Sequence, residues 1–248
     1  MKTALITGAT SGIGAATARI LAQDHRLILC GRRTEQLDAI ARELQSQTAV
    51  FTLSFDVSDS LAVSAAIDSL PPEWSAIDVL INNAGNAHGL DRFQDGDLDD
   101  YKAMININVL GLIYVTKAVL PLMEQSLNGH IVNLSSIAGK ETYTNGTVYC
   151  ASKAAVEALS QGMRMDLLER GIKVTNVAPG AVETEFSAVR FKGDQQRAAQ
   201  VYQGYTPLTA DDVARAIHFA IGQPDGVQVA DITLFPKAQA AATLIKKN

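Results

Sequence analysis

The sequence predicts a single-domain α/β fold in which helices cover both faces of a parallel sheet. Short apolar runs alternate with amphipathic stretches along the whole chain of 248 residues, which is the pattern of repeated strand–helix units. The runs at residues 27–30 and 79–81 are continuously apolar, as expected for strands that are buried on both faces. No linker rich in proline, glycine or serine divides the chain, so we expect one domain over residues 1–248.

Two periodicities place the elements of this fold. Apolar runs predict strands over residues 3–7, 27–30, 49–54, 79–82, 130–135, 173–178 and 231–234. Apolar residues at helical spacing predict helices over residues 13–23, 34–45, 60–70, 98–125, 147–170 and 210–221. The segment 183–207 breaks this rhythm, because it is long and polar and follows Pro179-Gly180. Long loops of compact domains usually cover a site, so we expect a substrate lid here, with a surface insertion as the alternative.

The composition excludes several classes of protein. The formal net charge is −5 and the pI about 5.4, so we expect no general attraction to nucleic acid or anionic lipid. Cys30 and Cys150 lie in apolar segments without the spacing of metal ligands, which indicates a reducing compartment and no metal site. The chain enters a strand at its N-terminus and shows no apolar run of about 18 residues. We therefore expect a cytoplasmic protein.

A glycine-rich turn between the first strand and the first helix predicts a nucleotide site. Glycines allow a sharp turn and let backbone N–H groups approach a pyrophosphate at the helix N-terminus, where the dipole favours an anion. The spacing is Gly-x-x-x-Gly-x-Gly rather than Gly-x-Gly-x-x-Gly, and a tight turn needs no ligand. Its position in a strand–helix–strand unit nevertheless favours a dinucleotide. The residues of this turn that we expect at the cofactor are Gly8, Thr10, Ser11, Gly12, Ile13 and Gly14.

The end of the second strand indicates which dinucleotide binds. Folds that prefer NAD carry an acid there for the ribose hydroxyls, whereas this chain has Arg32 and Arg33. Two guanidinium groups suit the 2′-phosphate of NADP, and a solvated cluster at a helix start is the alternative. Asp56 and Val57, after the third strand, are placed to meet the adenine ring. Asp56 could instead cap the following helix, for which Ser58 and Asp59 are better placed.

Polar residues at the ends of later strands are expected along the same rim of the sheet. In open α/β sheets, ligands collect beyond the carboxyl ends of the strands. The fourth strand ends at Asn83, which can tie strands together or line the cofactor, and the fifth ends at Ser135-Ser136. Asn108 is a polar residue inside an apolar helix and needs a hydrogen-bonding partner. Taken singly, each serine or asparagine is more often a cap than a catalyst.

Tyr149 and Lys153 form the clearest candidate for a proton-transfer pair. They are four residues apart on a predicted helix, so their side chains share one face. Lowering a tyrosine pKa from about 10 to near neutrality requires roughly 4 kcal/mol. A unit charge at about 4 Å supplies about 4 kcal/mol at an effective dielectric constant of about 20. One lysine therefore has the right size of effect, although a solvated or core tyrosine is the alternative.

Taken together and in order, these motifs resemble the single-domain short-chain dehydrogenase/reductase family. The shared motifs are residues 7–14, residues 82–85, Asn108, Ser136-Ile137-Ala138-Gly139, Tyr149-x-x-x-Lys153 and Pro179-Gly180. The resemblance covers nearly the whole chain. It implies a Rossmann fold with a seven-stranded parallel sheet, a nicotinamide cofactor and hydride transfer. It also implies a four-helix dimer interface, commonly doubled to a homotetramer.

The same resemblance implies a role for each site residue. Tyr149 is the general acid and base, and Lys153 lowers its pKa and binds the nicotinamide ribose. Ser136 steadies the substrate oxygen, and Asn108 holds a helix kink and a water of the proton relay. The later residues implied at the cofactor are Asn83, Ala84, Gly85, Tyr149, Lys153, Pro179, Gly180, Val182 and Thr184.

A closer likeness is to the bacterial NADP-dependent 3-hydroxy acid dehydrogenases, a subgroup that acts on serine, 3-hydroxypropionate and similar acids and includes sulfoacetaldehyde reductases. The segments that carry it are residues 31–33, 70–74, 82–87 and 185–194. It implies a small substrate with an anionic end. Arg190 is the first candidate for that anion, because a forked donor fits carboxylate or sulfonate, and Lys192 is the second. A solvated lid charge is an equally good explanation of either residue.

Other residues are expected to complete or surround the substrate pocket. Tyr143 and Phe186 should shape it together with Ser136, Tyr149 and Arg190. His88 follows the fourth strand and could touch substrate, although a surface histidine is the more usual case. Cys150 lies between the acid and its lysine, and we interpret it as a packing residue.

The sequence therefore predicts an NADP-dependent oxidoreductase that interconverts a short 3-hydroxy acid and its oxo form. Within this class, the alternative is a sulfoacetaldehyde/isethionate or other small carbonyl reductase. An NADP-binding sensor or scaffold without turnover is an alternative of another class. A bulky substrate, such as a steroid or an acyl-carrier thioester, would require a long apolar pocket with no cation near the substrate.

Overall fold

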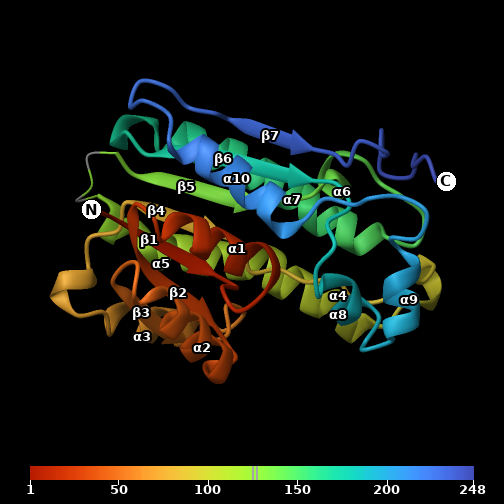
Figure 1. The fold of residues 1–248 in the computed structure, drawn as a ribbon, viewed down its shortest axis with the longest axis horizontal. Coiled ribbons are helices and arrows are strands. Elements are labelled where there is room, and N and C mark those ends of the chain that lie inside the picture. Colours follow the sequence, from red (N-terminus) through yellow and green to blue (C-terminus); the bar gives the residue numbers. More distant parts are fainter. Residues whose placement is uncertain (125, 127) are drawn as a thin grey trace.

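A seven-stranded parallel sheet forms the centre of the computed structural model, which describes residues 1–124, 126 and 128–248 (Figure 1). The strand order is β3-β2-β1-β4-β5-β6-β7, and neighbouring strands pair in parallel. The strands are β1 (Lys2–Thr7), β2 (His25–Gly31), β3 (Val50–Ser54), β4 (Val79–Asn82), β5 (His130–Leu134), β6 (Lys173–Pro179) and β7 (Asp231–Leu234). The predicted parallel sheet is confirmed, and each predicted strand is present with small shifts at its ends.

Helices cover both faces of this sheet, as predicted. The helices are α1 (Gly12–Leu21), α2 (Thr34–Leu44), α3 (Ser60–Asp68), α4 (Leu98–Ile105), α5 (Leu112–Met123), α6 (Ile137–Lys140), α7 (Thr147–Asp166), α8 (Phe186–Arg190), α9 (Gln195–Gln200) and α10 (Ala210–Ile221). Short helical turns lie at η1 (Pro72–Trp74), η2 (Phe93–Asp95), η3 (Asn106–Gly111) and η4 (Leu168–Arg170). The helix predicted over residues 147–170 is thus α-helical only to Asp166, the end of α7, and the rest of it forms the short turn η4.

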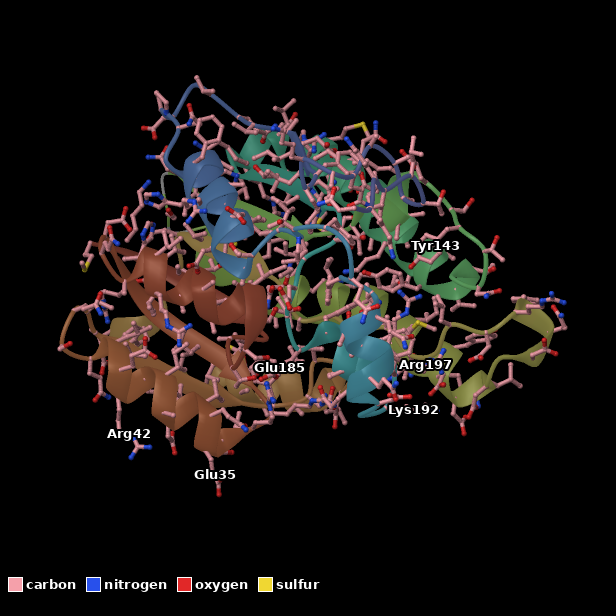
Figure 2. All side chains as sticks on the ribbon, turned by 45° about the vertical axis from the view of Figure 1, so that its right-hand side comes forward. Glu35, Arg42, Tyr143, Glu185, Lys192 and Arg197 are labelled. Atoms are coloured by element: carbon pink, nitrogen blue, oxygen red, sulfur yellow. The ribbon has the colours of Figure 1, made fainter. Side chains whose placement is uncertain are left out.

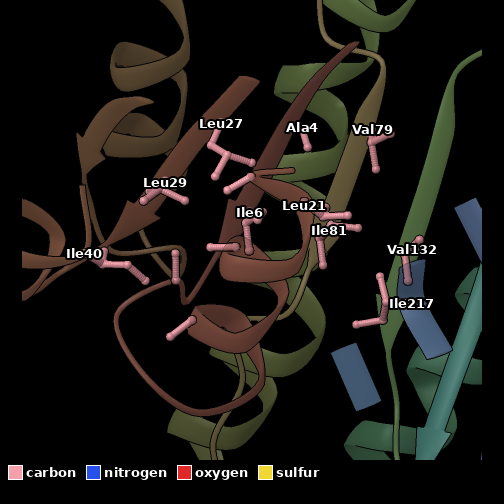
Figure 3. Packing of buried hydrophobic residues seen from close by; sticks show 14 of the residues in the cluster. Ala4, Ile6, Leu21, Leu27, Leu29, Ile40, Val79, Ile81, Val132 and Ile217 are labelled. Atoms are coloured by element: carbon pink, nitrogen blue, oxygen red, sulfur yellow. The ribbon is translucent and has the colours of Figure 1, made fainter. Parts of the chain in front are cut away.

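Two hydrophobic clusters, one on each face, hold the layers together. On one face α1, α2 and α10 bury residues such as Leu21, Ile40 and Ile217 against the strands, as Figure 3 shows. On the other face, α3, α5 and the end of α7 pack against the same strands through residues such as Ile67 and Val119. Strand residues buried on both sides explain why the sequence shows continuous apolar runs instead of alternation.

The long helix predicted over residues 98–125 is interrupted in the structure. It consists of α4, the π-helical turn η3 and α5, and its predicted last residue lies outside the described part of the chain. Asn108 in η3 is buried and forms two hydrogen bonds with the backbone of Asn86: Nδ2 donates to the carbonyl oxygen, and Oδ1 accepts from the N–H, both at 2.8 Å. The side chain therefore fixes this turn to the loop after β4, and the widened turn supports the predicted helix distortion at Asn108.

The run from Leu98 to Met123 is long and apolar enough to cross a membrane by length and composition alone. The structure gives a different reason for its apolar character. Val115, Val119 and Met123 of α5 belong to the buried cluster beneath the sheet. The expectation that the sequence contains no apolar run of this length was therefore wrong, because α5 is an apolar helix of the protein core.

The segment 183–207 is not irregular throughout, which corrects the sequence-based prediction. It contains the short helices α8 and α9, and the Asp194 side chain caps α9 by accepting a hydrogen bond from the backbone N–H of Arg197. Both helices are too short for a helical periodicity to emerge from the sequence. They lie on the side toward which β5, β6 and β7 run in Figure 1, beyond the carboxyl ends of the strands.

Candidate active site

The glycine turn after β1 is a tight, clamped structure. Gly8 has a φ of 64°, a left-handed conformation that favours glycine. A Cβ atom on Gly14 would lie 2.3 Å from the carbonyl oxygen of Gly8, so the start of α1 packs directly on the turn. Asn83 closes it, since Nδ2 donates to the carbonyl oxygens of Thr7 at 2.9 Å and Gly8 at 3.2 Å. Of the two roles predicted for Asn83, the structure shows that it ties β4 to β1.

The two arginines after β2 stand beside this turn. Arg33 donates from Nη2 to the hydroxyl of Thr10 at 2.8 Å and to that of Ser11 at 2.9 Å. Arg32 donates from Nη1 to Asp56 Oδ2 at 3.1 Å. Both guanidinium groups are exposed, and their carboxylate partners Asp56 and Glu185 are solvent-accessible as well, so each fork is accessible to a phosphate.

The carboxyl group of Asp56 remains ionised in this cluster. Burial acts to raise its pKa, but hydrogen bonds from Ser58 and the nearby charge of Arg32 outweigh burial, so the pKa lies below its usual range. The N-cap of α3 is Asp59, which accepts hydrogen bonds from two backbone N–H groups of that helix. Of the two residues predicted as caps, Ser58 and Asp59, Asp59 is the one that caps this helix, and Asp56 pairs with Arg32 and Ser58 instead.

Helix α7 buries Tyr149 and Lys153 one turn apart, with exposures of 7% and 5%. Burial raises the pKa of the Tyr149 phenol, and Tyr143 adds to the rise, whereas the Ser136 hydroxyl and Arg190 act to lower it. The prediction that this pKa is lowered is therefore wrong for the structure, because desolvation outweighs the favourable charges. A phenol with a raised pKa stays protonated and is poised to donate a proton.

Lys153 does not lower the pKa of Tyr149 in this structure. Burial disfavours the charged form of the lysine, and its ammonium group points to a backbone carbonyl instead of the phenol. Burial lowers its pKa to about 8, while Glu157, one turn further along α7, acts to raise it. The Nζ atom donates to the carbonyl oxygen of Leu134 at 2.8 Å, at the end of β5. A Cβ atom on Gly85 would lie only 3.3 Å from this Nζ, so the glycine keeps space open in front of the ammonium group.

The two serines after β5 have different partners. The hydroxyl of Ser136 caps α6 by accepting from the backbone N–H of Ala138 at 3.1 Å and is near enough to Tyr149 to influence its pKa. The hydroxyl of Ser135 donates to the carbonyl oxygen of Lys153 at 3.1 Å. Ser135 thus secures α7, and the geometry favours Ser136 as the serine that meets a substrate.

Asn108 is linked to the same helix through a serine. Its Nδ2 donates to Ser152 Oγ at 3.0 Å, and Ser152 Oγ donates to the carbonyl oxygen of Tyr149 at 2.7 Å. The π-helical turn is therefore coupled to the backbone that carries the phenol. This is a positioning role, and it is compatible with the relay role that the resemblance implies.

Arg190, at the end of α8, lies against the tyrosine. Its guanidinium carbon is 5.5 Å from the ring centroid of Tyr149 and 5.7 Å from that of Tyr143. It donates from Nε to the carbonyl oxygen of Gly89 at 3.0 Å and from Nη1 to the Tyr143 hydroxyl at 3.1 Å. Lys192, by contrast, is exposed and pairs with Asp100 at 2.9 Å. Of the two predicted anion-binding residues, Arg190 is the one beside Tyr149.

A small pocket, partly open to solvent, adjoins Tyr149 and Arg190. Phe186 packs on the Tyr149 ring with centroids 5.7 Å apart. Tyr143 lies on the same side of the molecule as Lys192, on the right in Figure 2. The lining residues that the sequence did not single out include Asp97, Asp100, Tyr101, Met104 and Asn145. They come from α4 and the loop before α7, which no local signal relates to the strand ends.

His88 also lines this pocket, although a surface position was the more usual expectation from sequence. Cys150 is fully buried, as its interpretation as a packing residue requires.

The remaining residues predicted at the cofactor lie in α1 or at or after the carboxyl ends of β3, β4 and β6. Thr184 approaches the turn, since a Cβ on Gly12 would be 3.4 Å from its side chain. Val182 forms a bridge with Leu208, and Gly180 packs on Gln239. The other predicted residues lie as follows: Ile13 in α1, Val57 after β3, Ala84 after β4 and Pro179 at the end of β6.

This rim fits a phosphorylated dinucleotide. The turn offers backbone N–H groups at the start of α1, the exposed arginines stand beside it, and Gly85 leaves a space that a Cβ would fill next to Lys153 and Asn108. Arg33 lies beside the glycine turn, whereas Tyr149 lies on α7 beside Ser136 and Arg190. The arrangement can hold an extended cofactor with its reactive end next to a phenol and a cation.

Comparison with known proteins agrees with this arrangement. Residues 2–195 match the short chain dehydrogenase family. The chain is 45% identical to an NADP-dependent 3-hydroxy acid dehydrogenase of Schizosaccharomyces pombe, with 100% of this chain and 97% of the relative covered. It is also 45% identical to sulfoacetaldehyde reductase 2 of Chromohalobacter salexigens, with 95% and 94% covered. Among solved structures, the closed form of a serine dehydrogenase complexed with NADP+ is similar, with a TM-score of 0.92, 39% identity and 99% of each chain covered.

Proposed function

Because this chain belongs to the short-chain dehydrogenase family and is an oxidoreductase of that family, we propose that it interconverts a short 3-hydroxy acid and its oxo form with NADP as cofactor. Serine and 3-hydroxypropionate are the first substrates to consider. Two relatives support this choice, since they are named for 3-hydroxy acids and for serine. The residues of the site support it independently, as follows.

NADP supplies a hydride acceptor or donor when it is bound. In this chain, the residues of the glycine turn would hold its pyrophosphate, and Arg32 and Arg33 its 2′-phosphate. Asp56 and Val57 would border its adenine, and Lys153 its nicotinamide ribose. The other residues proposed at the cofactor are Asn83, Ala84, Gly85, Tyr149, Pro179, Gly180, Val182 and Thr184.

The proton chemistry belongs to Tyr149. Its raised pKa keeps the phenol protonated, so it is ready to donate to the substrate oxygen when an oxo acid is reduced. Ser136 would donate a hydrogen bond to the same oxygen as charge develops there. In the reverse direction the phenol must first lose its proton, which burial opposes. Asn108 holds the helix in register and would support the relay that returns the proton to solvent.

One observation carries the choice of substrate: the guanidinium group of Arg190 lies beside Tyr149 on the wall of the pocket. A cation held next to the acid that protonates the reacting oxygen would place a carboxylate within a few bonds of that oxygen. A 3-hydroxy acid has this spacing. The contacts of Arg190 with Gly89 and Tyr143 keep the fork oriented, which lowers the entropy lost on binding the anion.

The test is NADP-linked activity on serine, 3-hydroxypropionate, 3-hydroxyisobutyrate and isethionate in parallel, with 1,3-propanediol as the neutral match to 3-hydroxypropionate. We expect Arg190→Gln to raise KM for the preferred acid by about 10- to 100-fold, the range for hydrogen bonds to charged groups, and to leave that for the diol nearly unchanged. Lys102→Gln, which removes an exposed charge on α4, serves as the control. An equal effect of Arg190→Gln on both substrates would contradict the assignment.

A sulfonate is the second candidate for the anionic end, because a relative with 45% identity is named for sulfoacetaldehyde. A guanidinium fork accepts sulfonate as well as carboxylate. The same assay decides between them, since isethionate would then give the highest kcat/KM of the series.

Lid, assembly and location complete the proposal. We place the substrate lid at residues 183–207, because Glu185 pairs with Arg33 at 3.4 Å and Arg190 docks on the loop after β4. A homotetramer is supported by exposed apolar side chains on α4 and at the end of α7, such as Leu98 and Met165. Sedimentation of the purified protein as a monomer would contradict it.

A cytoplasmic location is supported by the two cysteines, which are free and buried, as is usual in a reducing compartment.

A further inference from the structure

His88 lies on the wall of the same pocket as Tyr149 and Arg190, and the mechanism above assigns it no role. It is partly buried, and its Nε2 is 2.7 Å from the side-chain Nδ2 of Asn86. With the amide turned this way, Nδ2 donates to Nε2 and the ring proton is on Nδ1, while Asn86 Oδ1 is buried without a hydrogen-bond partner among the described residues. The ring therefore offers an N–H donor from the nitrogen that Asn86 does not occupy.

The asparagine that orients this ring is itself held rigidly. Asn86 is 8% exposed, and its backbone N–H and carbonyl oxygen both pair with the side chain of Asn108 at 2.8 Å. Burial lowers the pKa of His88, and the charges of Lys192 and Arg32 lower it further, while Asp100 acts to raise it. The imidazole is consequently neutral at neutral pH and carries a proton on only one of its two ring nitrogens.

The loop that carries His88 also holds Arg190 through the backbone of Gly89. The backbone N–H of Gly89 donates to the carbonyl oxygen of Arg190 at 2.9 Å, and Arg190 Nε donates back to the carbonyl oxygen of Gly89 at 3.0 Å. Gly89 adopts a φ of 66°, which favours glycine. Residue 88 is thus adjacent in sequence to the backbone group that positions the guanidinium.

The donors of Arg190 are partly used within the protein. Nε is engaged by Gly89 and one N–H of Nη1 by Tyr143, which leaves the tips of the fork for a ligand. A carboxylate offers about four acceptor positions, and a buried one is stable only when several of them are filled. A neutral donor beside the fork would fill another position without adding charge.

We propose that His88 is a substrate-binding residue that donates a hydrogen bond from Nδ1 to the anionic group held by Arg190. The two residues then select together for small acids over neutral alcohols and carbonyls. This inference rests on the proposed function for its ligand, but the tautomer of His88 and its support by Asn86 are properties of the protein alone.

The first experiment is therefore independent of activity. Nitrogen-15 NMR of the histidine rings, assigned with His88→Gln, should show the neutral Nδ1–H form of His88. Asn86→Leu should remove that preference and leave a mixture of tautomers. A dominant Nε2–H form in the unaltered protein would overturn the proposal, whatever the enzyme reduces.

The second experiment measures selectivity. His88→Leu should raise KM for the preferred acid by about 10-fold or more, with little change in KM for 1,3-propanediol or NADP. His88→Gln retains an N–H donor and should recover part of the loss. His218→Leu, at an exposed histidine of α10 paired with Asp24, is the matched control. Equal losses for acid and diol would refute the role of His88, whereas absence of turnover with every acid would refute the proposed function and leave the tautomer result standing.

Discussion

Replacement of Lys153 by methionine tests how burial acts on the charge one helical turn from Tyr149. Lys153 is 5% exposed, its ammonium group donates to the carbonyl oxygen of Leu134, and burial lowers its pKa to about 8 from an ordinary value of 10.5. Methionine has a similar length and carries no charge. The substitution therefore removes the titration with little change in packing.

The magnitude follows from the two pKa values. Because the pKa is lower in the folded protein, the unfolded chain binds more protons between pH 8 and 10.5, and stability rises with pH over that window. Integrated from about pH 7 to about pH 9.5, this group contributes a rise of about 2 kcal/mol in the free energy of unfolding. The wild-type protein should gain about 2 kcal/mol relative to Lys153→Met over this interval.

The assay is urea unfolding of both proteins without added cofactor, followed by the fluorescence of Trp74 at a series of pH values. The protein concentration is kept constant, because subunit association would contribute to the apparent stability. Lys237→Met, at an exposed lysine, is the control and should show no such relative change. A stability difference between Lys153→Met and wild type that stays level across this pH range would refute the buried-charge argument.

Four further outcomes are expected. Tyr149→Phe should abolish turnover while NADPH still binds, as judged by its fluorescence; retained turnover would contradict the role of the phenol. Arg32→Ala combined with Arg33→Ala should raise KM for NADP far more than for NAD, and an unchanged preference would refute the phosphate assignment. Since burial raises the pKa of Tyr149, oxidation of the hydroxy acid should accelerate as pH rises above neutrality, and a rate that falls over that range would argue against Tyr149 as the base. Gly89→Ala should cost about 1–2 kcal/mol of unfolding free energy through its left-handed conformation, measured in urea against Gly226→Ala, where an added Cβ meets no neighbour; equal costs would exclude strain at Gly89.

The sequence by itself determined the sheet, its covering helices and most of the cofactor rim. These features depend on local signals: apolar periodicity, glycines in one turn and the residues that follow each strand. Parallel strands then align their carboxyl ends by topology, so Arg33, Ser136 and Tyr149 could be assigned to one rim without knowledge of contacts. The expected Tyr149–Lys153 pair was found on one helix because helical geometry is also local.

Only the tertiary structure decided what surrounds those residues. The π-helical turn at Asn108 depends on hydrogen bonds to a distant loop, and the docking of Arg190 depends on Gly89, about a hundred residues away in sequence. The sign of the Tyr149 pKa shift was wrong from sequence because desolvation depends on every atom packed around the phenol. The tertiary structure likewise decides which charged side chains line the pocket and places His88 beside them. The segments that meet there are distant along the chain, and no local sequence pattern relates them.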